Sequence, residues 1–368
     1  MPDVCGVNPT DDTFLAQART CAATATHKTA PNPKVGCVIV HRDGHVIATG
    51  VTEPAGGRHA ERVALDMAGD DAAGATVYVT LEPCNHHGRT PPCTDALIQA
   101  GVHKVVYALA DSNPRATGGA AALLAAGVDV VGPLDPNHPV RHDVARDLAG
   151  FFSVINAGRP QLTLKLAQDA SGNTLPKPGQ YLTGEHARHD VHRLRARADA
   201  VLVGANTVNV DNPKLTVRLH DLPHDYEQPH AVIFDRRLQS NPASAVCKPG
   251  TILLTRDTHL PEQFAPFTAR GVTVSTFTAT GRDTDDAKAA LATLVAHGVN
   301  DVLAEPGLTL AASLCAAGVV DTLVLHVVNG HDGRFTPCVS LDSFTEISRH
   351  TYDQHDTAYT YVAKRKTP

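Results

Sequence analysis

Three residues that can bind a metal ion, His59, Cys84 and Cys93, constrain the fold of this chain more than any other feature of its sequence. Zinc prefers imidazole and thiolate donors, and a catalytic zinc ion usually takes three protein ligands and keeps its fourth position for water. His59 opens a helix-like run after two glycines, Cys84 follows a β-rich run over residues 76–82, and Cys93 opens a second helix-like run after two prolines. The fold must therefore bring two helix N-termini and one strand end to one point.

Glu61 lies two residues after His59, and Cys84 directly follows a proline. Hydrolytic removal of an amino group from an aromatic amidine carbon needs an activated water and a group that moves protons to the ring and to the leaving ammonia. Zinc nucleobase deaminases combine His-x-Glu with Pro-Cys, and their glutamate is the general acid and base rather than a ligand. The pattern therefore predicts a catalytic zinc site with Glu61 as the catalytic residue.

Two other interpretations of these ligands stay open. The three residues can form a structural zinc site if a fourth ligand closes the coordination sphere, and His86 and His87 are the nearest spare donors. The cysteines can also be ordinary buried thiols. A zinc-stabilised binding protein without catalytic activity is therefore the alternative from a different functional class.

The composition argues against several classes of protein. A chain of 368 residues is long enough for two domains of ordinary size. Its net charge of -6, its 4% aromatic residues and its lack of tryptophan argue against a platform for nucleic acid. No apolar run approaches the length of a membrane span and no basic, apolar leader opens the sequence, so we expect no membrane partner. The eight dispersed cysteines are unlike a disulfide scaffold, which predicts a cytoplasmic protein.

The order of the expected strands and helices predicts two α/β domains. In the first half, the pattern predicts a mixed sheet covered by helices, with a hairpin around Asp43-Gly44 and helical runs over residues 11–25, 116–126 and 141–152. A turn-rich segment over residues 156–160 marks the boundary, so we expect one domain at 1–152 and another at 160–368. The second half has strand-like runs at 162–167, 200–204, 231–235, 251–255, 272–277, 301–304 and 322–328. No Gly-x-Gly-x-x-Gly follows them, but Gly307 lies between a strand and a helix, where a phosphate can approach free amides.

Longer stretches around the three ligands resemble a known enzyme family. The segments 31–37, 59–61 and 80–93 together closely resemble the bifunctional deaminase-reductase family of riboflavin biosynthesis. Eight residues separate Cys84 from Cys93, as in that family, whereas other nucleobase and tRNA deaminases usually have two. The resemblance covers nearly the whole chain and is strongest before residue 115. A deaminase of tRNA or of nucleosides, which shares the zinc chemistry, is the alternative within the same class.

The resemblance implies a fold, a reaction and cofactors. It implies an N-terminal cytidine-deaminase-like three-layer domain followed by a dihydrofolate-reductase-like α/β domain. The family uses zinc to deaminate 2,5-diamino-6-(5-phosphoribosylamino)pyrimidin-4(3H)-one, a small phosphorylated pyrimidine, and then uses NADPH to reduce the ribosyl group to ribityl. It also implies a homo-oligomer. By the matching motifs, the resemblance implies that the deaminase substrate is bound by Asn32, His86 and Arg89, and that Arg89 contacts its phosphate.

The resemblance also assigns binding residues in the second half. It implies that NADPH is contacted by Ala167, Tyr181, Thr207, Asp211 and Gly307. It implies that the ribosyl phosphate substrate is held by Arg195, Leu215, Arg218 and Glu305, and two arginines suit a phosphate because a guanidinium binds it bidentately. The chain departs from the family pattern at Ser171, Asn173 and Pro306, and the proline removes a backbone amide. A zinc deaminase with an impaired reductase domain is therefore a further alternative, and the histidine-rich segment 220–230 is expected to be solvated surface.

Overall fold

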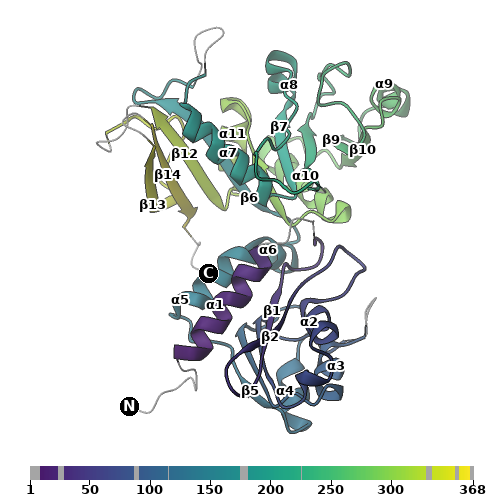
Figure 1. Ribbon diagram of the computed structural model, residues 1–368. Helices are drawn as coiled ribbons and strands as arrows, with labels where there is room; N and C mark the ends of the chain where they lie inside the picture. The colour runs from purple at the N-terminus through teal and green to yellow at the C-terminus, as the bar shows by residue number, and fades with distance from the viewer. Residues whose placement is uncertain are drawn as a thin grey trace. The chain divides into compact units, whose positions relative to one another are not determined.

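The structure is a computed structural model of the 368-residue chain, and it describes residues 9–23, 29–86, 91–114, 116–174, 181–224, 226–328, 334–352 and 356–364. The chain divides into two compact units, and the division falls between Ala157 and Gly158. Each unit has its own sheet and its own hydrophobic core (Figure 1). Within the described ranges, every helix is too short or too polar to cross a lipid bilayer.

The first unit is built on a five-stranded sheet with the strand order β2-β1-β3-β4-β5. The strands are β1 (Gly36–Val40), β2 (Val46–Val51), β3 (Thr76–Leu81), β4 (Lys104–Leu109) and β5 (Asp129–Val131). Strand β1 runs antiparallel to β2 and β3, whereas β3, β4 and β5 run parallel to one another. The predicted mixed sheet of the first half is therefore confirmed.

Helices cover both faces of this sheet, which gives the unit three layers (Figure 1). One helical layer contains α1 (Pro9–Ala23), α5 (Pro139–Asp147) and α6 (Ala149–Ala157). The other contains α2 (Ala60–Ala68), α3 (Cys93–Gln99) and α4 (Gly119–Ala125), and the short 3-10 helix η1 (Gly69–Ala72) follows α2. The apolar strand β1 lies between these layers and is buried along its whole length. A strand covered on both faces needs apolar residues on both sides, as its sequence Gly-Cys-Val-Ile-Val provides.

The helices expected over residues 141–152 and 116–126 differ from those observed. The single helix expected over residues 141–152 is two helices, because Leu148 leaves the helical conformation with a ψ of 8°. The helix expected over residues 116–126 begins only at Gly119. Ala116 lies in the preceding loop, where its carbonyl oxygen accepts a hydrogen bond from the amide of Asn85 at 3.1 Å. This contact ties the start of α4 to the loop that follows β3.

The second unit is built on a nine-stranded sheet with the order β10-β9-β8-β7-β11-β6-β12-β14-β13. The strands are β6 (Gln161–Asp169), β7 (Ala200–Gly204), β8 (His230–Phe234), β9 (Thr251–Arg256), β10 (Thr273–Phe277), β11 (Asp301–Ala304), β12 (Thr322–Val328), β13 (Phe344–Tyr352) and β14 (Asp356–Ala363). Strands β6 to β12 are parallel to one another. Strands β13 and β14 form an antiparallel hairpin at one edge, which the sequence analysis did not predict.

The connecting segments of this unit place several helix N-termini at one edge of the sheet. The helices are α7 (Glu185–Arg197), α8 (Ala205–Asp211), α9 (Ala265–Thr268), α10 (Asp283–Thr293) and α11 (Leu308–Ala316), with the 3-10 helices η2 (Pro261–Phe264) and η3 (Leu294–His297). Strands β7 and β11 are parallel neighbours, and α8 and α11 follow them directly, so both helices begin at the carboxyl edge of the sheet. Along β6 the side chains alternate: Leu162, Leu164 and Leu166 enter the core, whereas Lys165 and Ala167 face the opposite side.

Candidate functional sites

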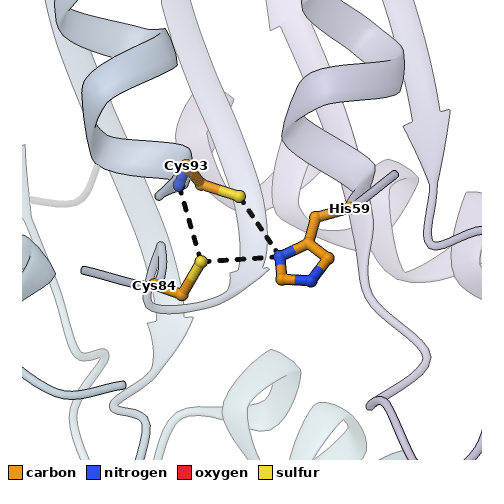
Figure 2. A group of neighbouring side chains, drawn as sticks. All are labelled: His59, Cys84 and Cys93. Atoms are coloured by element: carbon orange, nitrogen blue, oxygen red, sulfur yellow. Dashed lines mark hydrogen bonds between the residues drawn. The ribbon is translucent and has the colours of Figure 1, made fainter. Parts of the chain in front are cut away.

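Figure 2 shows the side chains of His59, Cys84 and Cys93 turned toward one point of the first unit. His59 is the N-cap residue of α2, Cys84 lies in the loop after β3, and Cys93 is the first residue of α3. Their ligand atoms all lie within 4.8 Å of one another. The structure therefore brings the three expected ligands together from two helix N-termini and one strand end.

The distances between these ligand atoms fit a tetrahedral zinc ion. His59 Nδ1 lies 3.4 Å from Cys84 Sγ and 3.4 Å from Cys93 Sγ. Zn–N bonds of about 2.0 Å and Zn–S bonds of about 2.3 Å at tetrahedral angles place nitrogen and sulfur about 3.5 Å apart. Nδ1 is thus the imidazole atom suited to bind the ion. The backbone amide of Cys93 lies 3.5 Å from Cys84 Sγ and can donate a hydrogen bond to its thiolate.

The protonation of the two thiols also indicates a cation site. The Cys84 thiol has a lowered pKa, because Cys93 and His59 stabilise its thiolate with hydrogen bonds. The Cys93 thiol has a raised pKa, because the neighbouring Cys84 sulfur and burial both disfavour a second negative charge. A bound cation stabilises both thiolates together, since thiols that coordinate a metal ion are deprotonated.

Two glycines allow close packing against the backbone that lies next to two of the metal ligands. A Cβ atom at Gly50 in β2 would lie 2.1 Å from the carbonyl oxygen of Ala60, the first residue of α2. A Cβ atom at Gly119 would lie 1.9 Å from the carbonyl oxygen of Pro83, the residue before Cys84. Any larger residue at either position would displace backbone that holds a metal ligand.

Glu82 fixes the loop that carries Cys84, a role that was not predicted from the sequence. Its buried carboxylate accepts hydrogen bonds from the amides of Asp111 at 3.3 Å and Ala120 at 3.0 Å. These bonds tie the loop after β3 to the segments that follow β4 and open α4. The signal in the sequence was a charged residue at the end of an apolar strand, because such a residue is rarely buried without partners. Glu82 is therefore a positioning residue.

Glu61 lies in the first turn of α2 and is 4% exposed. Burial raises the pKa of Glu61 to about 7, and the negative charge of Cys84 contributes in the same direction. A carboxyl group with this pKa takes up and releases protons near neutral pH, as a general acid and base must. One helix turn thus presents both a metal ligand, His59, and a proton carrier.

A cavity of about 300 Å³ opens beside the three ligands. Its lining includes His59, Glu61 and Cys84, and it also includes Asn32 and His86. His86 Nδ1 is buried and has no hydrogen-bond partner among the residues that the structure describes, so this atom can bond a ligand. Asp111 and Asn113 line the same cavity, although the sequence analysis did not select them. Arg89, the expected phosphate ligand, lies outside the described residues.

In the second unit, Arg195 and Glu305 form a nearly buried ion pair. Arg195 Nε donates to Glu305 Oε1 at 2.6 Å and Nη2 donates to Oε2 at 2.8 Å, while Nη1 donates to the Thr216 carbonyl oxygen at 3.0 Å. The two side chains are 12% and 15% exposed. The Arg195 guanidinium holds the pKa of Glu305 below its usual value despite burial. The pair joins the end of α7 to the end of β11.

Further basic groups surround this ion pair. Lys165 on β6 has a lowered pKa because its surroundings exclude water, an effect that the nearby Glu305 opposes. His192 has a pKa lowered to about 4 by burial and by the charges of Arg195 and Arg218. His192 Nδ1 accepts a hydrogen bond from the backbone amide of Arg218 at 3.3 Å. Roles in binding were expected from the sequence for Arg195, Arg218 and Glu305 but not for Lys165 or His192.

Three more of the expected binding residues are Leu215, in the loop after α8, and Thr207 and Gly307, near the N-termini of α8 and α11. Leu215 is buried and has a φ of 54°, a conformation that is strained for a branched side chain. It directly precedes Thr216, the carbonyl partner of Arg195. Gly307 is the N-cap residue of α11, and a Cβ atom there would lie 3.9 Å from Thr207 Oγ1. The structure therefore brings Thr207 and Gly307 together where β7 and β11 end.

The remaining expected cofactor ligands are spread more widely. Ala167 lies on β6, two residues beyond Lys165 on the same face of the sheet. Tyr181 is 76% exposed, and its ring lies under the Arg188 guanidinium at 4.5 Å. Asp211 is exposed at the last residue of α8. The Arg195–Glu305 ion pair and the basic residues around it, Lys165, His192 and Arg218, are called the ionic cluster below. Of the three residues described here, Ala167 alone shares a strand with a member of this cluster, Lys165.

The departures from the family pattern have clear local structures. At the end of β6, Asp169 accepts hydrogen bonds from the amides of Ser171 at 2.8 Å and Asn173 at 2.9 Å, and the Asn173 side chain donates to it at 2.8 Å. Pro306 is buried between Glu305 and Gly307. In the histidine-rich segment 220–230, His220 and His224 are exposed.

A three-layer α/β fold that combines a His/Cys/Cys site with a buried glutamate defines the class of zinc-dependent deaminases. The family model described as "Cytidine and deoxycytidylate deaminase zinc-binding region" matches residues 8–109, which contain all three ligands. The model described as "RibD C-terminal domain" matches residues 160–337 in the second unit. The chain is thus a two-part protein with a zinc-dependent deaminase unit followed by a reductase unit.

The named proteins to which this chain is similar belong to one family. The riboflavin biosynthesis protein RibD of Escherichia coli (strain K12) is 37% identical over 331 residues, which are 86% of this chain and 87% of the relative. RibD of Corynebacterium ammoniagenes is 38% identical over 81% of this chain and 80% of the relative. A structure of Acinetobacter baumannii RibD, form 2, matches with a TM-score of 0.80 at 33% identity and covers 96% of this chain and 99% of that one. The chain belongs to the RibD family, and the predicted fold class, deaminase and reductase activities, zinc and NADPH are confirmed.

Proposed function

We propose that residues 1–152 deaminate 2,5-diamino-6-(5-phosphoribosylamino)pyrimidin-4(3H)-one and that residues 160–368 reduce its ribosyl group to ribityl with NADPH. The observation that carries the proposal is the placement of His59, Cys84 and Cys93 around one point, with the buried Glu61 lining the same cavity. A solved relative from Thermotoga maritima is titled a diaminohydroxyphosphoribosylaminopyrimidine deaminase/5-amino-6-(5-phosphoribosylamino)uracil reductase, and it matches this chain with a TM-score of 0.79 at 28% identity. That title supports the choice of substrate.

In the deaminase unit, Glu61 carries the protons. A zinc ion held by the three ligands supplies a Lewis acid that lowers the pKa of the attacking water. Glu61 takes a proton from that water as a C–O bond forms at the carbon that bears the amino group, and it protonates the ring nitrogen. Glu61 then takes the second proton from the hydroxyl group now bonded to that carbon and delivers it to the amino group, so that the C–N bond breaks, a carbonyl forms and ammonia leaves. The raised pKa of Glu61 suits both transfers.

The cavity walls supply the contacts that orient the pyrimidine. Asn32 and His86 line the cavity that contains Glu61, and the Nδ1 of His86, which has no partner among the described residues, suits a polar edge of the substrate. Arg89 follows His86 by three residues, and its guanidinium suits the substrate phosphate by charge. A mixed set of amide, imidazole and guanidinium groups matches a polar base that carries an anionic tail.

In the reductase unit, the ionic cluster holds the sugar phosphate. Arg218 offers an exposed guanidinium for the phosphate, and the bidentate contact with Glu305 fixes the orientation of Arg195. Leu215, which directly precedes the carbonyl partner of Arg195, is the further substrate contact in this proposal. Bound NADPH would supply the hydride for the anomeric carbon, whose bond to the ring oxygen breaks. The proton that the ring oxygen takes up is assigned to Lys165, whose lowered pKa makes proton release easier.

The NADPH phosphates are assigned to the carboxyl edge of the parallel strands. There the N-termini of α8 and α11 lie side by side, with Thr207 close to Gly307, and helix N-termini attract anions. Ala167, Tyr181 and Asp211 are the further cofactor contacts in this proposal. The proposal also includes a homo-oligomer in the cytoplasm, and the free cysteines found among the described residues support a reducing compartment.

The decisive experiment separates the two half-reactions. Purified protein is given the diaminopyrimidinone ribosyl phosphate, and ammonia release and NADPH oxidation are followed independently. We expect both ammonia release and NADPH oxidation with this substrate. When the deaminated product is supplied instead, we expect NADPH oxidation alone. Ammonia release without oxidation identifies a single-function deaminase, and turnover of tRNA or free nucleosides in place of this substrate identifies the other deaminase class.

A closed structural zinc site is the remaining competitor. Within the described residues, the ligand group contains His59, Cys84 and Cys93 and does not include His86. A three-ligand site keeps an exchangeable water, whereas a structural site is closed by a fourth protein ligand. We therefore expect the spectrum of cobalt-substituted protein to change when a small anion such as azide is added. An unchanged spectrum, with no ammonia release, would identify a zinc-stabilised binding protein.

A further inference from the structure

The hairpin between β1 and β2 carries a second group of potential metal ligands. His41, Asp43 and His45 offer two imidazole nitrogens and one carboxylate oxygen, and these atoms lie within 4.8 Å of one another. The amide of His41 donates to the carbonyl oxygen of His45 at 2.9 Å, so the two histidines lie opposite each other. Residues opposite each other on antiparallel strands present their side chains on the same face, and here the ring centroids are 4.9 Å apart.

The turn holds Asp43 between the two rings. Asp43 Oδ1 accepts a hydrogen bond from the His45 amide at 3.1 Å, and it lies 2.5 Å from His45 Nδ1 and 3.1 Å from His41 Nδ1. Gly44 has a φ of 93°, and its amide donates to the His41 carbonyl oxygen at 2.9 Å. The backbone therefore gathers all three donor atoms before any ion binds, which lowers the entropic cost of binding.

The surroundings leave these donors open to an ion. The side chains of His41, Asp43 and His45 are 44%, 61% and 62% exposed. Arg42 is the basic residue of the turn, and its Nε donates to the carbonyl oxygen of Gly74 at 3.2 Å. Its charge is thus held against the loop before β3. Water can complete the coordination sphere on the open side.

We propose that His41, Asp43 and His45 form a second metal site, for a divalent first-row transition ion such as Ni²⁺, Cu²⁺ or Zn²⁺. Such ions accept imidazole nitrogen together with carboxylate and water oxygen, whereas Ca²⁺ and Mg²⁺ prefer oxygen ligands alone. The site lies beyond the end of β1 at Val40, whereas the catalytic cavity is lined by Val35 before the start of this strand. A bound ion therefore clamps the tip of the hairpin and stabilises the first unit without touching the substrate.

Calorimetric titration of the full chain with Ni²⁺, with the catalytic site first filled with zinc, tests the proposal. The parent protein is expected to bind one more equivalent of Ni²⁺ than the His45→Gln variant. His41→Gln and Asp43→Asn are expected to weaken the same site by about tenfold or more, since even the loss of a group that supports a ligand has such an effect. His103→Gln is the matched control, because His103 is an exposed histidine with one acidic neighbour, Asp129, at 3.7 Å.

Thermal unfolding and ammonia release supply readouts that do not depend on counting ions. Ni²⁺ is expected to raise the unfolding temperature of the first unit in the parent and in His103→Gln but not in His45→Gln. Ammonia release is expected to be the same in all three proteins. Equal Ni²⁺ stoichiometry and affinity in the parent and in His45→Gln would overturn the proposal. A loss of Ni²⁺ binding in His103→Gln would also overturn it.

Discussion

One buried histidine is expected to control the acid stability of the second unit. His326 on β12 is 0% exposed, and neither of its ring nitrogens has a hydrogen-bond partner within the described part of the chain. Its ring stacks on Tyr352 with the centroids 5.9 Å apart. Burial lowers the pKa of His326 from 6.5 to about 3, and the positive charge of Lys165 acts in the same direction. The folded unit therefore keeps this histidine neutral at a pH where the unfolded chain binds a proton.

The size of the effect follows from the two pKa values. A group whose pKa is lowered by folding contributes stability above its unfolded pKa and loses that stability as the pH falls toward the folded pKa. Each pH unit within this window costs about 1.4 kcal/mol, so the fall from pH 6.5 to about pH 5 costs about 2 kcal/mol of unfolding free energy. At about pH 5 the cost does not depend on the folded pKa, provided that this pKa lies below about 4.

Hydrogen exchange in β12 and β14 measures this cost. Mass spectrometry at about pH 7.5 and about pH 5, corrected for intrinsic exchange rates, gives the opening free energy of this part of the sheet. The parent is expected to lose about 2 kcal/mol more than the His326→Leu variant, which has no ring to protonate. His350→Gln is the control, because His350 contacts the same Tyr352 ring at 4.6 Å but is exposed. Equal losses in the parent and in His326→Leu would refute the reasoning.

Three further predictions concern the two sites. Glu61→Gln is expected to slow ammonia release by a factor of about 100 or more while zinc content, measured by elemental analysis, stays the same. Removal of zinc by a chelator is expected to abolish ammonia release but to preserve NADPH oxidation with the deaminated product, and loss of both activities would contradict separate sites. Arg195→Ala is expected to lower the unfolding free energy of the second unit by about 3 kcal/mol, because Glu305 is left buried without its partner. Urea denaturation should show a smaller loss when Glu305→Ala is added, and equal or larger loss in the double variant would argue against the ion pair.

The deaminase site could be predicted from the sequence because its groups are close in the chain and chemically distinctive. His59 and Glu61 share one helix turn, and the segment from Cys84 to Cys93 connects a strand end to a helix start. Local spacing was therefore sufficient to propose the ligand set. The support from Glu82 was not predictable, because its partners belong to segments 29 and 38 residues away.

The reductase site was harder to predict because it is assembled from distant parts of the chain. Arg195 and Glu305 are 110 residues apart, and neither has a pattern that identifies its partner. Lys165 looked like an ordinary polar position on an alternating strand, and its neighbours became visible only when β6, β11 and α7 were placed together. His326 was missed for a similar reason, because burial on both sides of β12 depends on the unpredicted hairpin β13–β14.

The position of Pro306 bears directly on the activity of this second site. Helix α11 begins at Leu308 with Gly307 as its N-cap residue, so Pro306 lies outside the first turn. The amides that an α-helix leaves without intrahelical partners are those of its first turn, and none of them belongs to the proline. The amide of Glu305 donates to the Leu202 carbonyl oxygen at 2.8 Å, so the strand is held in place before the proline begins. Pro306 therefore removes neither the helix N-terminus that suits a cofactor phosphate nor the contact between Glu305 and Arg195, which argues against an impaired reductase.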